Sequence, residues 1–330
     1  MNPSAPLTRR RSLALAACLA AATLASPAAL AQAYPAKPIT MVVPFPPGGP
    51  TDMVARLLAQ KMSEQMGQSV VVDNKPGANG NIGGLQVSRA AADGYTLLYN
   101  TSSITLSPAL YKSMQYDVLR DLAPVALTAV VPLALVVNPA VPANNVQEFV
   151  AYAKAHPGKL SYGSAGNGNV THLAAYQFVK AQGIDATHVP YRGSAPADVD
   201  LVAGQIQFMT DTINSVMAFV KDRRMKLLAV TTGKRMSLFP DVPTLAETVM
   251  PGFEAGAWQG LMVPAGTPAA VVQRLNAEVN KALQNPELRE KLAVQGAEPL
   301  GSTVDEYGAY LRKELARWAG VVKATGVTLD

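Results

Sequence analysis

Short apolar runs alternate with amphipathic segments along most of this 330-residue chain. Beside the run at 39–43, the clearest are SVVVDN, YTLLYN, LALVVN, LSYGS, THVPY, IQFMTD and LLAVTT. Most of these runs lack polar alternation, which is typical of strands buried on both faces of a parallel sheet. Helical patterns fall between many of them, and this alternation predicts an α/β fold.

The last third of the chain carries clear helix starts. The Thr-Pro pair at 267–268 predicts an N-cap followed by proline in the first turn, and the Asn-Pro pair at 285–286 predicts a second, shorter helix. Thr303 and Glu306 form a capping-box pattern ahead of the last apolar stripe. We expect the apolar stripes of these helices to face the core and not a ligand.

The segment VPFPPGGPTDMVARLLAQKM places three prolines and two glycines between a strand and an amphipathic stretch. Pro50 suits the first position of a helix, because its missing N–H would have no intrahelical partner there. Gly48 and Gly49 leave backbone N–H groups uncovered at the positive end of the helix dipole, which favours a bound anion. A simple tight turn would show the same residues, so this loop alone does not establish a site.

A second loop of this design follows Ser161, in SYGSAGNGNVTHLAAYQFVKAQG, and NTSSITLSPALY and VPYRGSAPADVDLVAG resemble it. Its glycines run G-x-x-G-x-G, the wrong order for a dinucleotide fingerprint, and no Walker lysine is present. Loops at the carboxyl ends of strands converge on ligands in open α/β sheets. We therefore expect these loops to face one another across a cleft between two lobes.

The N-terminus predicts export. Arg9, Arg10 and Arg11 precede an apolar core and the small-residue sequence Ala-Gln-Ala at 31–33, so residues 1–33 form a secretory signal peptide and the mature chain begins near Tyr34. The arginines leave the general-secretion and twin-arginine routes open. The sequence LAAC, ending at Cys18, offers lipidation as an alternative. We expect a soluble, exported mature protein.

Composition narrows the possible functions. Cys18 is the only cysteine, so the mature chain has no disulfide, thiol nucleophile or cysteine-bound metal. Loss of the three signal arginines leaves 25 of the 28 basic residues against 23 acidic ones, a formal charge of +2. Nucleic-acid binding is therefore excluded. The histidines at 156, 172 and 188 are too scattered for a metal site, and the G-x-S-x-G motif of serine hydrolases does not occur. We therefore expect a binding protein without metal or cofactor. A secreted hydrolase or lyase is the alternative.

Motifs spread over nearly the whole mature chain resemble one known family. They are GGPTDMVARLLAQKM, VDNKPGANGNIG, DGYTLL, LSYGSAGNGNVTHLAA, HVPYRGSAPADVDLVAGQI and LFPDVPTLAE. Together they are similar to the Bug family of periplasmic receptors, the solute-binding components of tripartite tricarboxylate transporters. The resemblance implies a two-lobed type II periplasmic-binding-protein fold, with a hinge and an interlobe cleft that closes on a carboxylate-bearing solute.

The resemblance also implies ligand-binding residues. In lobe 1 these are Phe45, Gly49, Thr51, Asp52, Ser102 and Thr105; in lobe 2 they are Ser164, Ala165, Asn169, Thr171, His172 and Asp211. Arg192 is a further candidate, because a guanidinium binds carboxylates through charge-assisted hydrogen bonds.

Three of these residues, Asp52, His172 and Arg192, have a structural alternative. Asp52 lies in the first turn of a helix, where an acid stabilises the dipole and would repel a carboxylate. Asp211 at the end of a strand suits a ligand ammonium or hydroxyl. His172 fits a structural hydrogen bond as well as a ligand contact, and Arg192 fits a surface ion pair.

The sequence thus predicts a monomeric receptor with lobe 1 at 34–131, lobe 2 at 132–255 and a return to lobe 1 at 256–330. We expect helix N-termini from both lobes to bind the carboxylates of a small molecule, which the receptor delivers to a membrane permease. A solute-sensing subunit of a signalling system would use the same cleft and is the alternative function. The sequence does not distinguish among dicarboxylates, tricarboxylates, amino acids and aromatic acids.

Overall fold

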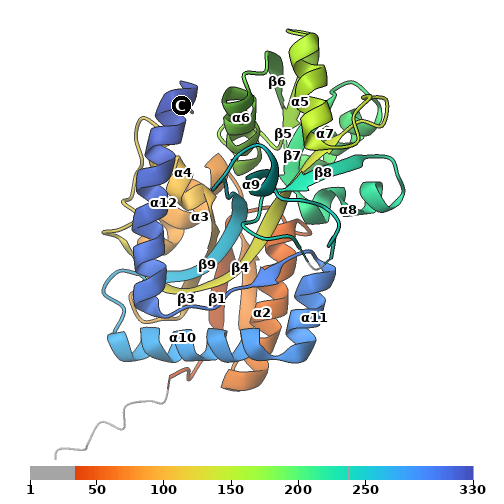
Figure 1. Cartoon of the computed structure of the whole chain (residues 1–330). Coiled ribbons are helices and arrows are strands. Elements are labelled where there is room, and N and C mark those ends of the chain that lie inside the picture. The colour runs from red at the N-terminus through yellow and green to blue at the C-terminus, as the bar shows by residue number, and fades with distance from the viewer. Residues whose placement is uncertain (1–33, 237, 330) are drawn as a thin grey trace, which may run out of the picture. The chain divides into compact units, whose positions relative to one another are not determined.

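The computed structural model describes residues 34–236 and 238–329, so the predicted signal peptide and Cys18 lie outside the described residues (Figure 1). The strands are β1 (Ile39–Val43), β2 (Val70–Asn74), β3 (Thr96–Thr101), β4 (Leu122–Val137), β5 (Leu160–Ser164), β6 (Ala186–Pro190), β7 (Phe208–Thr212), β8 (Lys226–Val230), β9 (Gly256–Pro264) and β10 (Glu298–Pro299). The helices are α2 (Pro50–Met66), η1 (Ala78–Gly80), α3 (Asn81–Ser88), α4 (Ser103–Leu110), α5 (Val146–Ala155), α6 (Val170–Gln182), α7 (Ser194–Val202), α8 (Ile213–Lys221), α9 (Leu245–Thr248), α10 (Ala269–Gln284), α11 (Pro286–Val294) and α12 (Val304–Thr325).

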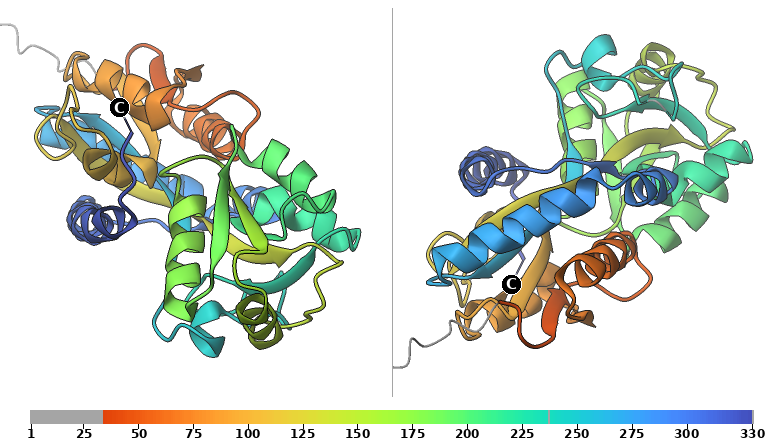
Figure 2. Two further views of the ribbon diagram at one scale, coloured as in Figure 1. Left: turned by 90° about the horizontal axis from the view of Figure 1, so that it is seen from above. Right: turned by 90° about the horizontal axis from the view of Figure 1, so that it is seen from below.

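Lobe 1 is built on the strand order β2-β1-β3-β9-β4. β1 pairs in parallel with β2 and β3, whereas β9 pairs antiparallel with β3 and β4. α10 packs against α2, α11 and β4, and the view from below in Figure 2 shows α10 in front of the strands. The parallel strands place the loops that follow β1 and β3 at one edge of the sheet, where the site lies.

Lobe 2 repeats this arrangement on a smaller scale. β5 pairs in parallel with β6 and β7, and the last residues of β4 pair antiparallel with β7 and β8. α6, α7 and α8 follow β5, β6 and β7 in turn, so three helices begin directly after three neighbouring strands.

β4 connects the two lobes. Its residues 122–132 pair with β9, and its residues 133–137 pair with β7 and β8, so the partner changes between Pro132 and Leu133. β9, at Gly256, is the first strand after β8 and returns the chain to lobe 1. The predicted lobe boundaries, between residues 131 and 132 and between residues 255 and 256, stay a prediction.

α12 contributes to two hydrophobic clusters. Tyr307 and Leu311 pack with Trp258 in the core of lobe 1, while Trp318 and Val322 belong to the cluster that contains the core of lobe 2 and part of α4. Buried Glu314 accepts a hydrogen bond from Trp258 Nε1 at 3.3 Å and from Trp318 Nε1 at 2.8 Å. One carboxylate therefore connects an aromatic residue of each cluster.

The helix starts of the last third are mostly as predicted. α12 has both hydrogen bonds of a capping box between Thr303 and Glu306, and the Asn285 side chain accepts from Leu288 N–H at the start of α11. The predicted cap of α10 is wrong in detail. Pro268 occupies the N-cap position, and the Thr267 hydroxyl donates instead to the carbonyl of Pro264 at 2.8 Å.

Candidate functional site

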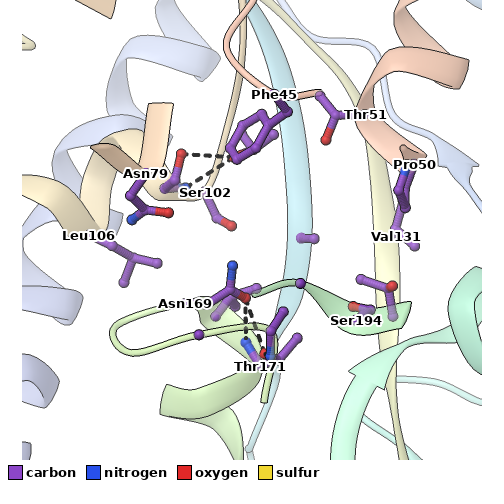
Figure 3. Close-up of a pocket in the computed structure, with 18 of the residues that line it drawn as sticks. Phe45, Pro50, Thr51, Asn79, Ser102, Leu106, Val131, Asn169, Thr171 and Ser194 are labelled. Carbon is purple, nitrogen blue, oxygen red and sulfur yellow. Dashed lines mark hydrogen bonds between the residues drawn. The ribbon is translucent and has the colours of Figure 1, made fainter. Parts of the chain in front are cut away.

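A cavity of about 510 Å³ is lined by residues of both lobes (Figure 3). The lining residues of lobe 1 are Phe45, Pro50, Thr51, Asn79, Thr101, Ser102, Ser103, Leu106, Tyr111, Val131, Ala257, Gln259 and Leu329. Those of lobe 2 are Ala165, Gly166, Asn167, Asn169, Val170, Thr171, Gly193, Ser194, Asp211 and Thr212. The cavity is large enough for a small organic ligand.

Five helices begin at the cavity wall. They are α2, α4, α6, α7 and α8, and their N-cap residues are Gly49, Ser102, Asn169, Gly193 and Thr212. Only Asn169 caps its helix through its side chain, which accepts from Thr171 N–H. The N-cap side chains of the other four helices make no capping hydrogen bond, although Ser103 N–H in the first turn of α4 donates to Thr101 Oγ1 at 3.2 Å. Each of these helices presents a positive dipole end to the cavity.

The loop before α2 is held in place by Asp52. The Asp52 carboxylate accepts from Gly48 N–H at 2.8 Å, from Arg56 Nε at 2.9 Å and from Asn74 Nδ2 at 2.9 Å. Burial alone would raise the pKa of Asp52, but these hydrogen bonds outweigh it and lower the pKa below its ordinary value. Phe45 and Thr51 line the cavity, whereas Gly49 and Asp52 are absent from its lining.

The wall beside α4 carries several small hydroxyl and amide side chains. Ser102 lines the cavity, and Thr105 lies behind it with its hydroxyl donated to the Ser102 carbonyl at 2.8 Å. The hydroxyls of Thr101 and Ser103 are bonded to each other at 3.0 Å. The amide nitrogen of Asn79 is buried and has no hydrogen-bond partner in the described part of the chain, so it is an available donor.

The loop before α6 is fixed from behind by two histidines. Thr171 Oγ1 accepts from Ala165 N–H at 2.9 Å, and Ala165, Asn169 and Thr171 all line the cavity. Ser164 Oγ lies 2.7 Å from His188 Nε2, and neither Ser164 nor His172 lines the cavity.

The rings of His172 and His188 stack with centroids 3.8 Å apart. Burial lowers the pKa of His172 to about 3, with a further contribution from His188, and burial lowers the pKa of His188 to about 4. Both rings are therefore neutral at physiological pH. His172 Nδ1 can then accept the hydrogen bond from Gly168 N–H, at 3.2 Å, which supports the loop.

Asp211 is fully buried at the end of β7. Its Oδ1 accepts from Ser194 Oγ at 2.8 Å and from Thr212 N–H at 2.6 Å. Burial raises the pKa of Asp211 despite these hydrogen bonds. Arg192, by contrast, is an exposed residue that does not line the cavity.

The charge of the cavity wall is unusual for an anion site. Among the described residues that line it there is no lysine, arginine or histidine, and Asp211 is the sole carboxylate. Positive potential must therefore come from helix N-termini and neutral donors. Within residues 34–236 and 238–329, no group of three or more His, Cys, Asp or Glu is arranged to hold a metal, and no helix is long and apolar enough to cross a bilayer.

Several wall residues are not singled out by the sequence. Val131, Gln259 and Leu329 come from segments far from the glycine-rich loops, and Leu106 and Tyr111 add apolar surface. Gln259 had a usable signal, because it is a lone amide within the apolar strand β9. Its Oε1 accepts from Tyr99 Oη at 2.8 Å, which leaves its amide NH₂ for the cavity.

Residues 54–327 match the family described as the tripartite tricarboxylate transporter family receptor. The structure of R. palustris Rpa4515 with adipate is 38% identical, has a TM-score of 0.82 and covers 89% of this chain and 99% of that one. The periplasmic binding protein BugD is 37% identical, with a TM-score of 0.78 and coverages of 89% and 99%. MatC from Rhodopseudomonas palustris with bound malate is 34% identical, with a TM-score of 0.77 and coverages of 88% and 100%.

These similarities confirm the predicted fold class, a two-lobed α/β periplasmic-binding-protein fold with a cleft between the lobes. They also confirm the resemblance seen in the sequence motifs. The family and the similar structures are binding proteins. The chain therefore belongs to the Bug family, the receptors of tripartite tricarboxylate transporters.

Proposed function

We propose that this protein is a periplasmic receptor that captures a carboxylate-bearing small molecule in the cavity and delivers it to the permease of a tripartite tricarboxylate transporter. Adipate and malate, bound by two similar receptors, are both dicarboxylates and support this ligand class. The protein acts as a monomer, is exported through the signal peptide at 1–33, and carries out no chemical step on its ligand.

The convergence of five helix N-termini on one cavity without a cationic side chain is the observation that carries this proposal. Backbone N–H groups at helix starts bind anions through direct hydrogen bonds and the aligned peptide dipoles. Inside a closed cleft, such bonds to a charged group each contribute about 1.5–3 kcal/mol. Affinity then depends on desolvated, directed donors and only weakly on the net charge of the protein.

Binding closes lobe 2 on lobe 1 about a hinge at the limits 131/132 and 255/256. The change of pairing partner within β4 and the start of β9 support these limits. Closure brings the N-termini of α2 and α4 from one lobe against those of α6, α7 and α8 from the other. The closed surface is what the permease recognises.

The test is thermal unfolding of the mature protein after it has been unfolded and refolded to remove carried-over ligand. The panel contains adipate, malate, citrate, glutamate and benzoate. A ligand that binds only the native state stabilises it by RT ln(1 + [L]/Kd), about 2.7 kcal/mol at a hundredfold excess over Kd. We expect one class of carboxylate to raise Tm; a folded protein that no acid stabilises would contradict the proposal.

A pair of variants on α4 locates the binding site. Ser102→Ala removes a hydroxyl from the cavity wall and should reduce the ligand-induced rise in Tm. Ser107→Ala, five residues further along the same helix and outside the cavity lining, should leave it unchanged. An equal effect of the two substitutions would place the ligand elsewhere.

A further inference from the structure

Three polar side chains form a hydrogen-bonded relay at the lobe 1 wall of the cavity. Gln259 of β9 lines the cavity and is 1% exposed, whereas Tyr99 of β3 and Thr128 of β4 are 0% exposed and lie behind the lining. Tyr99 Oη donates to Gln259 Oε1 at 2.8 Å and lies 2.9 Å from Thr128 Oγ1. Buried polar groups cost free energy unless each finds a partner, so the hydrogen bonds of this relay are constrained.

A β-bulge brings the far end of the relay into place. The register of β4 against β9 shifts between Leu127 and Ala129, so Thr128 is an extra residue in β4. β9 lies between β3 and β4 in the sheet, and the Thr128 hydroxyl nevertheless contacts Tyr99 on β3. Bulges re-aim side chains next to functional sites, and here the re-aimed hydroxyl completes the relay.

The protons of the relay fix the direction of the Gln259 amide. Tyr99 keeps its hydroxyl proton, because burial raises its pKa. With that proton donated to Gln259 Oε1, the Thr128 hydroxyl donates to Tyr99 Oη, and both hydroxyl protons have an acceptor.

The opposite direction leaves one proton unpaired. If the Gln259 amide were turned round, its NH₂ would donate to Tyr99 Oη and Tyr99 would donate to Thr128. The buried Thr128 hydroxyl would then have no acceptor among the described residues, because its one hydrogen-bond partner there is Tyr99. An unpaired buried donor carries the full cost of its desolvation, so the amide keeps its oxygen toward Tyr99.

The Gln259 NH₂ is left for the cavity. No described residue accepts a hydrogen bond from Gln259 Nε2, and this nitrogen is not enclosed as Asn100 Nδ2 is. The side chains of Val131 and Ala257, which line the cavity on the same two strands, offer it no acceptor. An amide with a purely structural role would have both its ends paired within the protein.

We propose that the relay of Thr128, Tyr99 and Gln259 holds the Gln259 amide as a fixed hydrogen-bond donor that selects a ligand with an acceptor oxygen, such as a second carboxylate, over one with an ammonium group at this place. The selection rests on the proposed function, whereas the amide direction is a property of the unliganded protein. A freely turning amide would present its oxygen to an ammonium group equally well, and the relay removes that choice. Gln259 is thus a specificity-determining residue, and Tyr99 is a positioning residue.

Neutron diffraction from crystals of the deuterated mature protein without ligand tests the direction of the amide. We expect the deuteron of Tyr99 to lie toward Gln259 Oε1, the deuteron of Thr128 to lie toward Tyr99 Oη, and both amide deuterons of Gln259 to lie away from Tyr99. An amide deuteron between Gln259 and Tyr99 would overturn the proposal.

Calorimetric titration with adipate and with 6-aminohexanoate tests the selection, because the second acid has an ammonium group in place of one carboxylate. Gln259→Glu keeps an acceptor for Tyr99 Oη but replaces the NH₂ by a charged oxygen. The preference for adipate, taken as the ratio of the two affinities, should therefore fall at least about tenfold. Gln207→Glu adds the same charge outside the cavity lining and should leave the ratio unchanged. An unchanged ratio in Gln259→Glu would refute the selection.

Tyr99→Phe separates positioning from general damage. Without the Tyr99 hydroxyl the Gln259 amide is free to turn, so adipate affinity should fall, by up to about tenfold, while the affinity for 6-aminohexanoate is kept. A packing fault would weaken the binding of both acids alike, and that result would overturn the positioning role. Thr128→Val should keep the ratio, because the Tyr99 proton still has Gln259 Oε1 as its acceptor. If neither acid binds, the proposed function loses support, and the neutron structure still decides the direction of the amide.

Discussion

Asn169→Asp adds one negative charge to the cavity with the smallest possible change of shape. Asn169 lines the cavity as the N-cap of α6, and its Oδ1 accepts from Thr171 N–H at 3.0 Å and from Thr171 Oγ1 at 3.2 Å. An aspartate keeps both acceptor contacts, because asparagine and aspartate are equally good N-caps. What changes is the charge, together with the loss of the amide donor.

The expected loss of affinity follows from Coulomb's law. Two unit charges about 4 Å apart repel by about 1 kcal/mol in water and about 4 kcal/mol at the effective dielectric of a protein surface. If the ligand also uses the amide NH₂ of Asn169, the lost hydrogen bond adds about 1.5–3 kcal/mol. We therefore expect carboxylate affinity to fall at least about tenfold, which corresponds to about 1.4 kcal/mol. The free energy of unfolding should change by less than about 1 kcal/mol.

Asn285→Asp is the matched control. Asn285 is the N-cap of α11, accepts from Leu288 N–H and lies outside the cavity lining. Affinity is measured by calorimetric titration with a stabilising acid of the panel, and stability by urea unfolding. An Asn169→Asp protein that binds the acid as tightly as the Asn285→Asp protein would refute the assignment of this cavity to a carboxylate.

Three further predictions concern stability. Ser107→Ala should be neutral or stabilise the protein, because the buried Ser107 hydroxyl has no hydrogen-bond partner in the described residues; urea unfolding by circular dichroism measures this, and a loss above about 1 kcal/mol would contradict it. Glu314→Ala should destabilise the protein by roughly 2–4 kcal/mol, because two buried indole N–H groups lose their acceptor; a loss below about 1 kcal/mol would show that the indoles find other partners. The pKa of His172 is about 3 in the folded protein, against about 6.5 unfolded, so its contribution to stability is present above the unfolded pKa and is lost as the pH falls below it. By pH 5 the free energy of unfolding has fallen by about 2 kcal/mol because of His172, and the half-buried His188 adds less. In His172→Gln the fall in the free energy of unfolding between neutral pH and pH 5 should be smaller by about this amount. Equal pH dependence of unfolding in wild type and variant would refute the assignment of a neutral His172 ring.

The parts of the fold that the sequence predicts well are those fixed by local interactions. Pro50 occupies the first position of α2, and Thr303 and Glu306 form both bonds of their capping box, because a cap involves only a few consecutive residues. Thr267 fails as a cap because the carbonyl of Pro264, three residues earlier, competes for its hydroxyl. Caps are therefore predictable only when no nearby backbone acceptor competes.

The loop residues of the cavity wall could be predicted from the sequence, whereas its strand residues could not. Phe45 and Ala165 lie in loops whose glycines and position after a strand mark them in the sequence. Gln259 and Val131 reach the wall only through the pairing of β9 with β3 and β4, and strand register over such sequence separations cannot be read from one chain. The Asp52 carboxylate likewise has a partner that one chain does not reveal, because it accepts a hydrogen bond from Asn74 of β2.

Val131 of β4 and Ala257 and Gln259 of β9 line the cavity beside the proposed hinge, so a ligand bound there would contact both strands. A side-chain change there would alter both the contact with the ligand and the fraction of receptor molecules that are closed without it. The observed dissociation constant equals the intrinsic constant divided by that closed fraction. A substitution in β4 or β9 that makes closure easier could thus strengthen binding while removing a favourable contact, so the measured affinities of such variants report two equilibria together.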